Sequence, residues 1–338
     1  MLQIVLEKPG QFAATDGPEP TLAPGEALVR VHRIGVCGTD LHAFAGNQPF
    51  FSYPRILGHE LGVEVLDPGS DPHGLQAGDR CSVEPYLNCG RCIACRRGKP
   101  NCCTSLNVLG VHSDGGMRPL FAVPARKLHR SAKLNYEQLA LVETLGIGAH
   151  AVERAELKPE DFVLVVGAGP IGLSVIQFAL VSGATLAVMD VSEPRLAFCR
   201  DQLGAQHTVT AGPDAAGQLK TVGAGDLPTV VIDATGNANS MAGTFDLVAH
   251  GGRIVFVGLF QGDVTFNDPN FHRREITLCA SRNAVPQTFR DIIALVEAGR
   301  VNTQPWITHR FALADTPTVF PEKIAGNPAV LKAMIAVD

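Results

Sequence analysis

The sequence has no apolar run of the roughly 18 to 20 residues that a membrane-spanning helix needs. Its first residues, MLQIVLEKPGQF, also lack the basic head and apolar core that are typical of a signal peptide. A large excess of either charge is missing too, because 28 Lys and Arg stand against 33 Asp and Glu, a formal net charge of -5. We therefore expect a cytoplasmic protein that binds neither a membrane nor nucleic acid.

Charged residues are few, at 18%, whereas hydrophobic residues reach 46%, and this balance argues against a disordered chain. Internal repeats and low-complexity segments are absent as well. The nine cysteines are an odd number, which weakens a disulfide framework and favours thiolates used for metal binding or chemistry. With 338 residues, the chain is long enough for two domains with separate cores.

Two patterns of secondary structure divide the chain. The first third has short strands separated by Gly and Pro, such as 27–37 and 61–66, which predicts a β-rich, barrel-like domain. Further on, strands and helices alternate, as in βαβ units on a parallel sheet. The strands are predicted at 162–166, 185–190, 229–233 and 253–258, and the helices after Pro170, at 194–203 and at 239–249.

These patterns predict a discontinuous first domain, 1–145 with 286–338, and a second domain at 146–285. Segment 137–155 has a helical pattern with a break expected in its Gly-rich middle. Segment 208–228, which is rich in Gly, Ala and Asp, is expected to be a surface connection.

The segment VLVVGAGPIG contains a G-x-G-x-x-G pattern at Gly167, Gly169 and Gly172. It follows an apolar strand and begins a helical pattern, which is the context of a dinucleotide-binding loop. Such glycines make a tight turn, admit a pyrophosphate to the backbone and let the helix pack closely on the sheet. The helix N-terminus then provides free N–H groups for the phosphates.

Asp190 ends the next predicted strand, where a carboxylate can accept hydrogen bonds from ribose hydroxyls and repel the 2′-phosphate of NADP. NAD is therefore the expected cofactor. A turn at Thr235 follows a later strand of the same sheet, and Arg195 lies near Asp190. The residues expected to bind the dinucleotide are Gly167, Gly169, Pro170, Ile171, Gly172, Asp190, Arg195 and Thr235.

Four cysteines lie within 15 residues in the pattern C-x2-C-x2-C-x7-C. They are Cys89, Cys92, Cys95 and Cys103, although the neighbouring Cys102 leaves the fourth position ambiguous by one residue. Four thiolates favour a closed tetrahedral zinc site that holds a polar loop in place. An iron–sulfur cluster and a zinc module for nucleic acid are the alternatives.

A second set of candidate ligands is mixed. GVCGTDLH carries Cys37, and ILGHELG carries His59 and Glu60. Three protein ligands of this kind are typical of a catalytic zinc, which keeps a fourth position for water or substrate. Each of these residues alone is more often structural, so the interpretation depends on their combination with the other two motifs.

Together these motifs resemble the zinc-dependent medium-chain dehydrogenases. The resemblance is carried by GVCGTDLH, GHE, the four-cysteine loop, GAGPIG and the Asp at the end of the second sheet strand, in family order over most of the chain. It implies an α/β fold with a GroES-like β-barrel catalytic domain, a Rossmann domain and an active site between them. It also selects Cys103 as fourth structural ligand and implies two zinc ions per chain and a homodimer or homotetramer.

The resemblance is greater to the sorbitol, threonine and polyol dehydrogenases than to the liver-type enzymes. It assigns Cys37, His59 and Glu60 to the catalytic zinc. Glu143 matches the Glu of the family's E-P motif, but a Thr replaces the Pro, so direct and water-mediated contact with zinc stay open. Thr39 matches the hydroxyl that contacts the substrate oxygen.

His42 matches a proton-relay histidine, which would pass the substrate proton from Thr39 and the ribose to solvent. Arg282 and Asn283 follow the last predicted sheet strand, and SRNA resembles the segment of L-galactonate- or L-idonate-type dehydrogenases. An Arg there offers a fork for a substrate carboxylate, although a surface salt bridge is an equal alternative. Phe50 and Phe51 are expected to line the substrate pocket or to be core residues.

The expected reaction is hydride transfer from a secondary alcohol of a polyol or sugar acid (an aldonate) to NAD. A neutral polyol or threonine is the alternative substrate. Zinc-free reductases and non-catalytic relatives of the fold form the alternative class, which the retention of Cys37, His59 and Glu60 disfavours.

Overall fold

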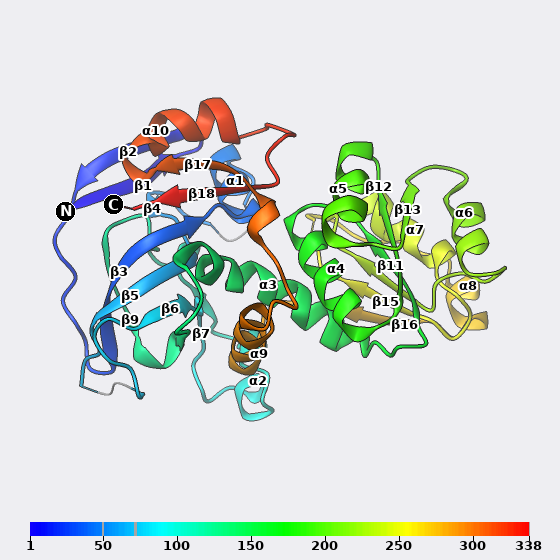
Figure 1. The fold of residues 1–338 in the computed structure, drawn as a ribbon, viewed down its shortest axis with the longest axis horizontal. Helices are drawn as coiled ribbons and strands as arrows, with labels where there is room; N and C mark the ends of the chain where they lie inside the picture. The colour runs from blue at the N-terminus through cyan, green and yellow to red at the C-terminus, as the bar shows by residue number, and fades with distance from the viewer. Residues whose placement is uncertain (49–50, 71–72, 338) are drawn as a thin grey trace. The chain divides into compact units, whose positions relative to one another are not determined.

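A computed structural model describes residues 1–48, 51–70 and 73–337. The chain divides into two compact units, coloured by residue number in Figure 1. Unit 1 comprises Met1–Thr144 and Val285–Asp338, and unit 2 comprises Leu145–Ala284. The boundaries expected from the sequence lie one residue further along the chain at each junction.

Unit 1 is built on a seven-stranded sheet with the order β10-β6-β5-β3-β18-β17, in which β9 also pairs with β3 (Figure 1). A three-stranded sheet, β2-β1-β4, and a two-stranded sheet, β7-β8, complete it. The strands are β1 (Leu2–Lys8), β2 (Gln11–Asp16), β3 (Glu26–Gly35), β4 (Arg55–Ile56), β5 (Glu60–Asp67), β6 (Arg80–Val83), β7 (Tyr86–Leu87), β8 (Asn107–Val108), β9 (Leu120–Pro124), β10 (Leu128–Arg130), β17 (Ile307–Ala312) and β18 (Lys332–Ala336).

The core of unit 1 is formed by branched aliphatic residues on the inner faces of these strands, among them Val29, Val31, Val63 and Ile335. β18, near the C-terminus, pairs with β3 from the N-terminal part. The last strand of the chain therefore completes the first domain, which explains why that domain is discontinuous. The helices of this unit are α1 (Gly38–Ala45), α2 (Ile93–Arg96), α9 (Pro286–Glu297) and α10 (Thr316–Val319).

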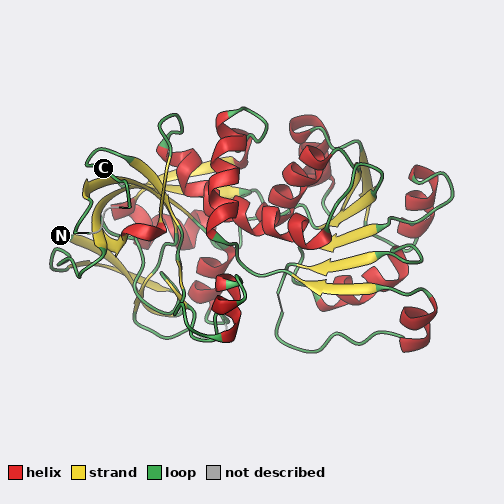
Figure 2. Cartoon of the chain, turned by 90° about the horizontal axis from the view of Figure 1, so that it is seen from below, coloured by secondary structure: helices red, strands yellow, loops and turns green. Residues whose placement is uncertain are grey.

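Unit 2 is a six-stranded parallel sheet in the order β13-β12-β11-β14-β15-β16. Its strands are β11 (Phe162–Val166), β12 (Thr185–Asp190), β13 (His207–Thr210), β14 (Val230–Asp233), β15 (Arg253–Phe256) and β16 (Thr277–Ala280). The helices are α4 (Pro170–Ser182), α5 (Glu193–Leu203), α6 (Ala215–Val222), α7 (Ala238–Leu247) and α8 (Asp268–Arg273), and Figure 2 shows helices on both faces of the strands.

This strand order is that of the doubly wound dinucleotide-binding fold, so the predicted Rossmann domain is confirmed. The nearly continuous apolar strands explain it, because each strand of a parallel sheet is buried on both faces. Val163, Leu164 and Val165 of β11, for example, are fully buried.

Two local predictions are wrong. α3 (Tyr136–Ala155) runs unbroken through its Gly-rich middle. Gly148 serves close packing within unit 2, since a Cβ there would lie 2.1 Å from Ser174 Oγ. Segment 208–228 is not a mere connection, because it contains part of β13 and all of α6. The helical spacing of its buried residues Ala215 and Leu219, four residues apart, is hard to recognise in a segment rich in Gly and Ala.

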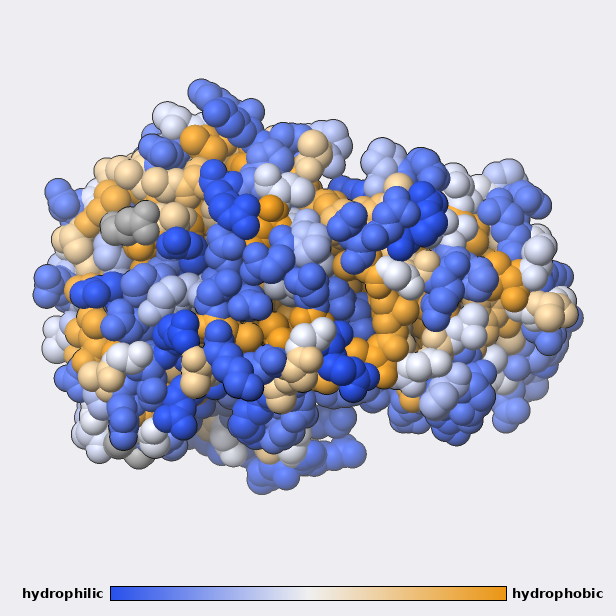
Figure 3. All heavy atoms as spheres, in the orientation of Figure 1, coloured by the Kyte–Doolittle hydropathy of each residue, from blue (hydrophilic) through white to orange (hydrophobic). Residues whose placement is uncertain are grey.

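Hydrophilic side chains cover most of the face drawn in Figure 3, with small apolar patches between them. No helix in the described part of the chain combines the length and the apolarity that crossing a membrane would require.

Candidate functional site

Three potential metal ligands meet in unit 1. Cys37 is the N-cap residue of α1, His59 precedes β5, and Glu60 is the first residue of β5. One ligand atom from each lies within 4.8 Å of the others. His59 and Glu60 are buried, and Cys37 is half-buried. The structure therefore brings together the three residues expected to bind a catalytic metal. We call them the mixed cluster.

The Glu60 side chain lies over Gly35 of the neighbouring strand β3. Gly35 of β3 pairs with Glu60 of β5, and a Cβ on Gly35 would lie 2.0 Å from Glu60 Oε2. Beyond β3, Lys332 Nζ of β18 donates to Glu60 Oε1 at 2.5 Å. Both partners are almost completely buried. Burial lowers the pKa of Lys332, but nearby negative charges, first that of Glu60, outweigh burial and raise the pKa above its ordinary value. A glycine at position 35 thus makes room for a buried ion pair.

The surroundings of His59 fit a cation. Its Nδ1 atom is buried without a hydrogen-bond partner and lies 3.9 Å from Asp40 Oδ1. Burial lowers the pKa of His59, but the nearby Cys37, Asp40 and Glu143 outweigh it and raise the pKa well above its ordinary value. Unpaired buried polar atoms are rare, and this negative environment is one that a zinc ion would neutralise.

The expected proton path lies on α1. Thr39 is half-buried in the first turn, and His42 follows three residues later, so both lie on one side of the helix. His42 is exposed, and its Nδ1 atom lies 3.0 Å from Asn47 Oδ1. A histidine in this position is able to exchange protons with water.

Glu143 lies on α3 and is buried near the mixed cluster, but it is not among the residues whose ligand atoms are all within 4.8 Å of one another. Burial raises the pKa of its carboxyl group, while His59 opposes this shift. The hydroxyl of Tyr86 donates a hydrogen bond to Glu143 Oε1. Of the two roles left open for Glu143, this geometry favours one outside the direct ligand set.

The four-cysteine loop also forms a compact cluster. Cys89, Cys92, Cys95 and Cys103 bring their sulfur atoms within 4.8 Å of one another, whereas Cys102 is exposed and lies outside this group. We call these four residues the thiolate cluster.

Backbone N–H groups donate to the sulfurs of the thiolate cluster. The N–H of Cys89 lies 3.3 Å from Cys103 Sγ, and that of Cys95 lies 3.5 Å from Cys92 Sγ. The latter bond, together with one from Thr104, lowers the pKa of Cys92 to about 5. Four thiolates stabilised in this way would fill all four positions of a tetrahedral zinc ion and leave none for a substrate. The thiolate cluster therefore fits a structural zinc ion.

The dinucleotide motif of unit 2 has the expected geometry. Gly167 has a φ of +94° and turns the chain from β11 towards α4. A Cβ on Gly172 would lie 1.7 Å from the Gly167 carbonyl oxygen, so only glycine allows this close packing. Around Gly169 no atom lies within 4 Å of an added Cβ, which leaves open space for a phosphate at the helix N-terminus. Pro170 and Ile171 form the first turn of α4.

Asp190 lies at the end of β12, beside this loop. Its carboxylate accepts hydrogen bonds from the N–H of Ala168 at 2.7 Å and of Ser192 at 2.8 Å. Two backbone contacts leave further lone pairs for ribose hydroxyls. Arg195 lies half-buried in the first turn of α5.

Thr235, one of the residues expected to bind the dinucleotide, lies just after β14. Its hydroxyl donates to Asp233 Oδ1 at 2.7 Å and accepts from the N–H of Asn237 at 3.1 Å. These bonds make Thr235 part of the turn after β14, where its methyl group packs under Gly167.

The expected substrate residues lie in both units. Arg282 is exposed and Asn283 has a φ of +53° with its Nδ2 atom buried, and both follow β16 of unit 2. Phe51 belongs to unit 1, where it packs against the core and contacts Tyr53 edge to face at 4.9 Å between ring centroids. Phe50 lies outside the described residues.

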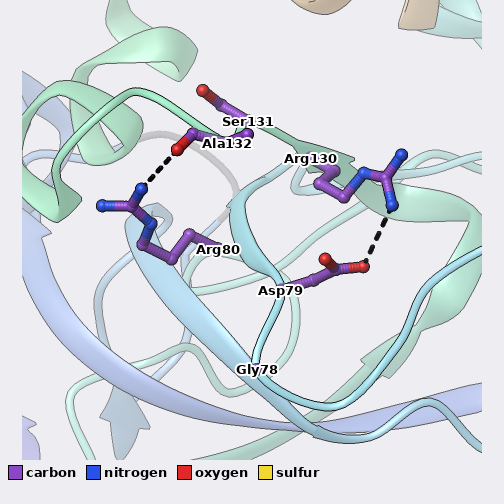
Figure 4. A pocket seen from close by; sticks show the side chains of 6 residues that line it. All are labelled: Gly78, Asp79, Arg80, Arg130, Ser131 and Ala132. Carbon is purple, nitrogen blue, oxygen red and sulfur yellow. Dashed lines mark hydrogen bonds and ion pairs between the residues drawn. The ribbon is translucent and has the colours of Figure 1, made fainter.

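A surface hollow of about 460 Å³ in unit 1 contains none of the expected site residues (Figure 4). Its two arginines are engaged by neighbours, because Arg80 donates to the Ala132 carbonyl at 2.5 Å and Arg130 pairs with Asp79 at 3.5 Å. Both arginines of the hollow are therefore held by their own neighbours, and nothing in the contacts of its lining marks it as a binding site.

The contacts of three residues around the mixed cluster were not predicted from the sequence: Gly35, which begins the GVCGTDLH segment, Tyr86 and Lys332. Gly35 and Lys332 lie far from Glu60 in sequence and meet it only because β5, β3 and β18 are neighbours. Lys332 offers one signal in the sequence, because it is a single lysine within the apolar run 329–337, and a lysine buried there needs a charged partner.

Comparison with known proteins identifies the family. Residues 23–133 match the alcohol dehydrogenase GroES-like domain, and residues 170–298 match the zinc-binding dehydrogenase domain. L-galactonate-5-dehydrogenase of Escherichia coli K12 is 38% identical over 98% of both chains. D-altritol 5-dehydrogenase of Agrobacterium fabrum is 33% identical over 97% of both.

Among solved structures, the alcohol dehydrogenase RspB of E. coli CFT073, complexed with NADH, superimposes with a TM-score of 0.89 at 30% identity over 99% of both chains. The chain belongs to the zinc-type medium-chain alcohol dehydrogenases, a family of oxidoreductases. Within this family it falls in the polyol and sugar-acid branch. The resemblance inferred from the motifs is thereby confirmed.

Proposed function

We propose that the protein is a cytoplasmic NAD-dependent dehydrogenase that oxidises a secondary hydroxyl of a sugar acid, an aldonate of the L-galactonate or L-idonate type. The observation that carries the proposal is the mixed cluster of Cys37, His59 and Glu60 in a chain that also has a complete dinucleotide loop. The similarity to L-galactonate-5-dehydrogenase supports the substrate class.

Each bound group has proposed ligands in this chain. Cys37, His59 and Glu60 would hold a catalytic zinc, the thiolate cluster a structural zinc, and the loop at Gly167–Gly172 with Asp190 the NAD. When bound, the catalytic zinc would lower the pKa of the substrate hydroxyl, and NAD would accept the hydride.

The remaining steps belong to side chains of the protein. We propose that the Thr39 hydroxyl accepts the substrate proton while it passes its own proton on, and that His42, exposed one turn later on α1, releases a proton to water. Asp190, held by the N–H groups of Ala168 and Ser192, would orient the ribose and disfavour the extra phosphate of NADP. Lys332 would keep Glu60 ionised and oriented.

Arg282 is the proposed recognition residue for the carboxylate, with Asn283 and Phe51 as further substrate contacts. Arg282→Ala should raise the KM for an aldonate by roughly 10- to 100-fold, since a hydrogen bond to a charged group contributes about 1.5–3 kcal/mol. The KM for the matching neutral polyol should change little. The measurement is NADH formation by the zinc-loaded protein with paired aldonates and polyols.

Arg290→Ala is a matched control, because Arg290 is also exposed and pairs only locally with Gln287 on α9. An equal rise in KM for both substrates after Arg282→Ala would contradict a role in carboxylate binding. A neutral polyol is the second candidate substrate, which the similarity to D-altritol 5-dehydrogenase favours. It would be preferred if the unaltered protein oxidised polyols faster than aldonates.

We also propose a homodimer or homotetramer. β16 is the last strand of its sheet, pairs only with β15 among the described strands, and exposes Leu278. An edge strand of this kind is able to pair with another chain. A mass in solution equal to the 35.8 kDa of one chain would contradict this proposal.

A further inference from the structure

Tyr86 lies between the two clusters of unit 1 and is used by neither. It is 2% exposed, and its hydroxyl donates a hydrogen bond to Glu143, which is 4% exposed. Burial, and then the charge of Glu143, raise the pKa of Tyr86 well above its ordinary value. The tyrosine therefore stays a neutral donor, and one carboxylate oxygen of Glu143 is occupied by it.

A packed column fixes the ring of Tyr86. The ring meets Phe289 edge to face at 6.2 Å, and Phe289 stacks on His129 at 4.9 Å. His129 Nε2 lies 3.0 Å from Glu84 Oε2, and Lys127 pairs with the other oxygen of Glu84. Glu84 and Lys127 are each 1% exposed. Because each member is buried and paired, the column leaves the Tyr86 hydroxyl little freedom to leave Glu143.

The backbone of Tyr86 is fixed by the thiolate cluster. Tyr86 begins β7, which pairs with β8 and leads directly into the loop that starts at Cys89. The loop returns through Cys103 to β8, so the four sulfurs close the far end of this two-stranded sheet. The strand that presents the hydroxyl to Glu143 is therefore held at one end by the candidate structural metal site.

A carboxylate beside a three-ligand metal site competes with substrate for the open position, since Asp and Glu oxygens are themselves zinc ligands. The charges of His59 and Glu60 act on the pKa of Glu143, which is buried like them but lies outside the mixed cluster. We propose that Tyr86 is a positioning residue that holds Glu143 outside the ligand set and keeps the fourth metal position open for substrate. The inference rests on the proposed zinc at Cys37, His59 and Glu60.

The test uses the full chain loaded with Co²⁺ in place of zinc, because the visible absorption of Co²⁺ reports the number and kind of its ligands. Tyr86→Phe keeps the ring and its packing but removes the donor. We expect the freed carboxylate to take the fourth position of the metal, with a shift of the visible bands as a carboxylate oxygen replaces water there. The Tyr86→Phe, Glu143→Gln double variant should restore the spectrum of the unaltered protein.

Two single variants serve as references. Tyr136→Phe removes the same hydroxyl from a tyrosine that stacks on His32 and has no part in either cluster, and its spectrum should be unchanged. Glu143→Gln alone should also leave the spectrum unchanged, because Glu143 is held outside the ligand set. The thiolate cluster contributes equally in all variants, so difference spectra remove its signal.

In the zinc enzyme, Tyr86→Phe should lower kcat/KM by about 10- to 100-fold, the usual effect of losing a partner around a metal site. The proposal is overturned if Tyr86→Phe leaves the Co²⁺ spectrum unchanged, or if Glu143→Gln alone changes it. A protein that binds Co²⁺ at Cys37, His59 and Glu60 but oxidises no alcohol would contradict the proposed function and leave this test of Tyr86 intact.

Discussion

The thiolate cluster and the mixed cluster are both candidate metal sites of unit 1, but they are built in opposite ways. The thiolate cluster takes all its residues from one 15-residue loop, and three of its four sulfurs belong to half-buried residues. The mixed cluster joins α1 to β5 in the middle of the barrel, where His59 and Glu60 are buried. One is a local loop closure, and the other is a product of strand pairing.

The difference extends to the surrounding charges. The sulfurs of the thiolate cluster accept hydrogen bonds mainly from backbone N–H groups of their own loop. The mixed cluster is surrounded by ionisable side chains, namely Asp40 of the same helix α1 and, from more distant segments, Glu143 and Lys332. A closed site surrounded by its own backbone suits a structural ion. A site with three ligands and tuned charges suits chemistry.

Cys37→Ser is expected to have the largest effect on activity. Loss of a thiolate ligand removes several kcal/mol of transition-state stabilisation, so kcat should fall by roughly 10³-fold. Because α1 and β5 do not depend on a metal for their packing, NAD binding should be retained. Steady-state kinetics and NAD titration measure the two effects, and full activity of this variant would exclude a catalytic metal at the mixed cluster.

Gly35→Ala should have an intermediate effect. The added Cβ would lie 2.0 Å from Glu60 Oε2, so the carboxylate must leave its position beside Lys332. We expect metal affinity or kcat/KM to fall by about 10- to 100-fold. Metal analysis after dialysis and kinetics provide the measurement.

Gly243→Ala in α7 is the control for the glycine variant, because no atom lies within 4 Å of the added Cβ. Equal losses of activity in both variants would mean that the effect of Gly35→Ala is not specific to the Glu60 carboxylate.

Cys92→Ser should have the smallest effect on the chemistry and a clear effect on stability. One metal ion per chain should be lost and Tm should fall by several degrees, while kcat stays within about threefold because the mixed cluster keeps its ligands. Calorimetry and metal analysis are the measurements. Cys102→Ser, at an exposed position outside the cluster, should leave both unchanged.

If instead Cys92→Ser abolished activity at unchanged Tm, the division between a structural and a catalytic cluster would be wrong. A moderate fall in kcat/KM with a changed Co²⁺ spectrum would point to the link through Tyr86. Cys92→Ser therefore also tests whether the thiolate cluster affects the mixed cluster through Tyr86.

The local motifs could be predicted because their physics is local. Gly167 must adopt a positive φ, and Gly172 must pack against its carbonyl, so their spacing alone marks the loop. The same holds for the thiolate cluster. The unbroken α3 could not be predicted, because whether a helical glycine breaks a helix or admits a neighbour depends on what packs there, in this case Ser174 at Gly148.

The sequence by itself predicted the two-domain α/β architecture, the dinucleotide loop, the four-cysteine loop and the three residues of the mixed cluster. Strand periodicity and short motifs carry this information within a few residues. Only the tertiary structure decided that Glu60 crosses Gly35 to reach Lys332 and that Tyr86 holds Glu143. Glu60 and Lys332 lie 272 residues apart and meet through the order of strands in one sheet, whereas Tyr86 and Glu143 meet where α3 packs beside β7.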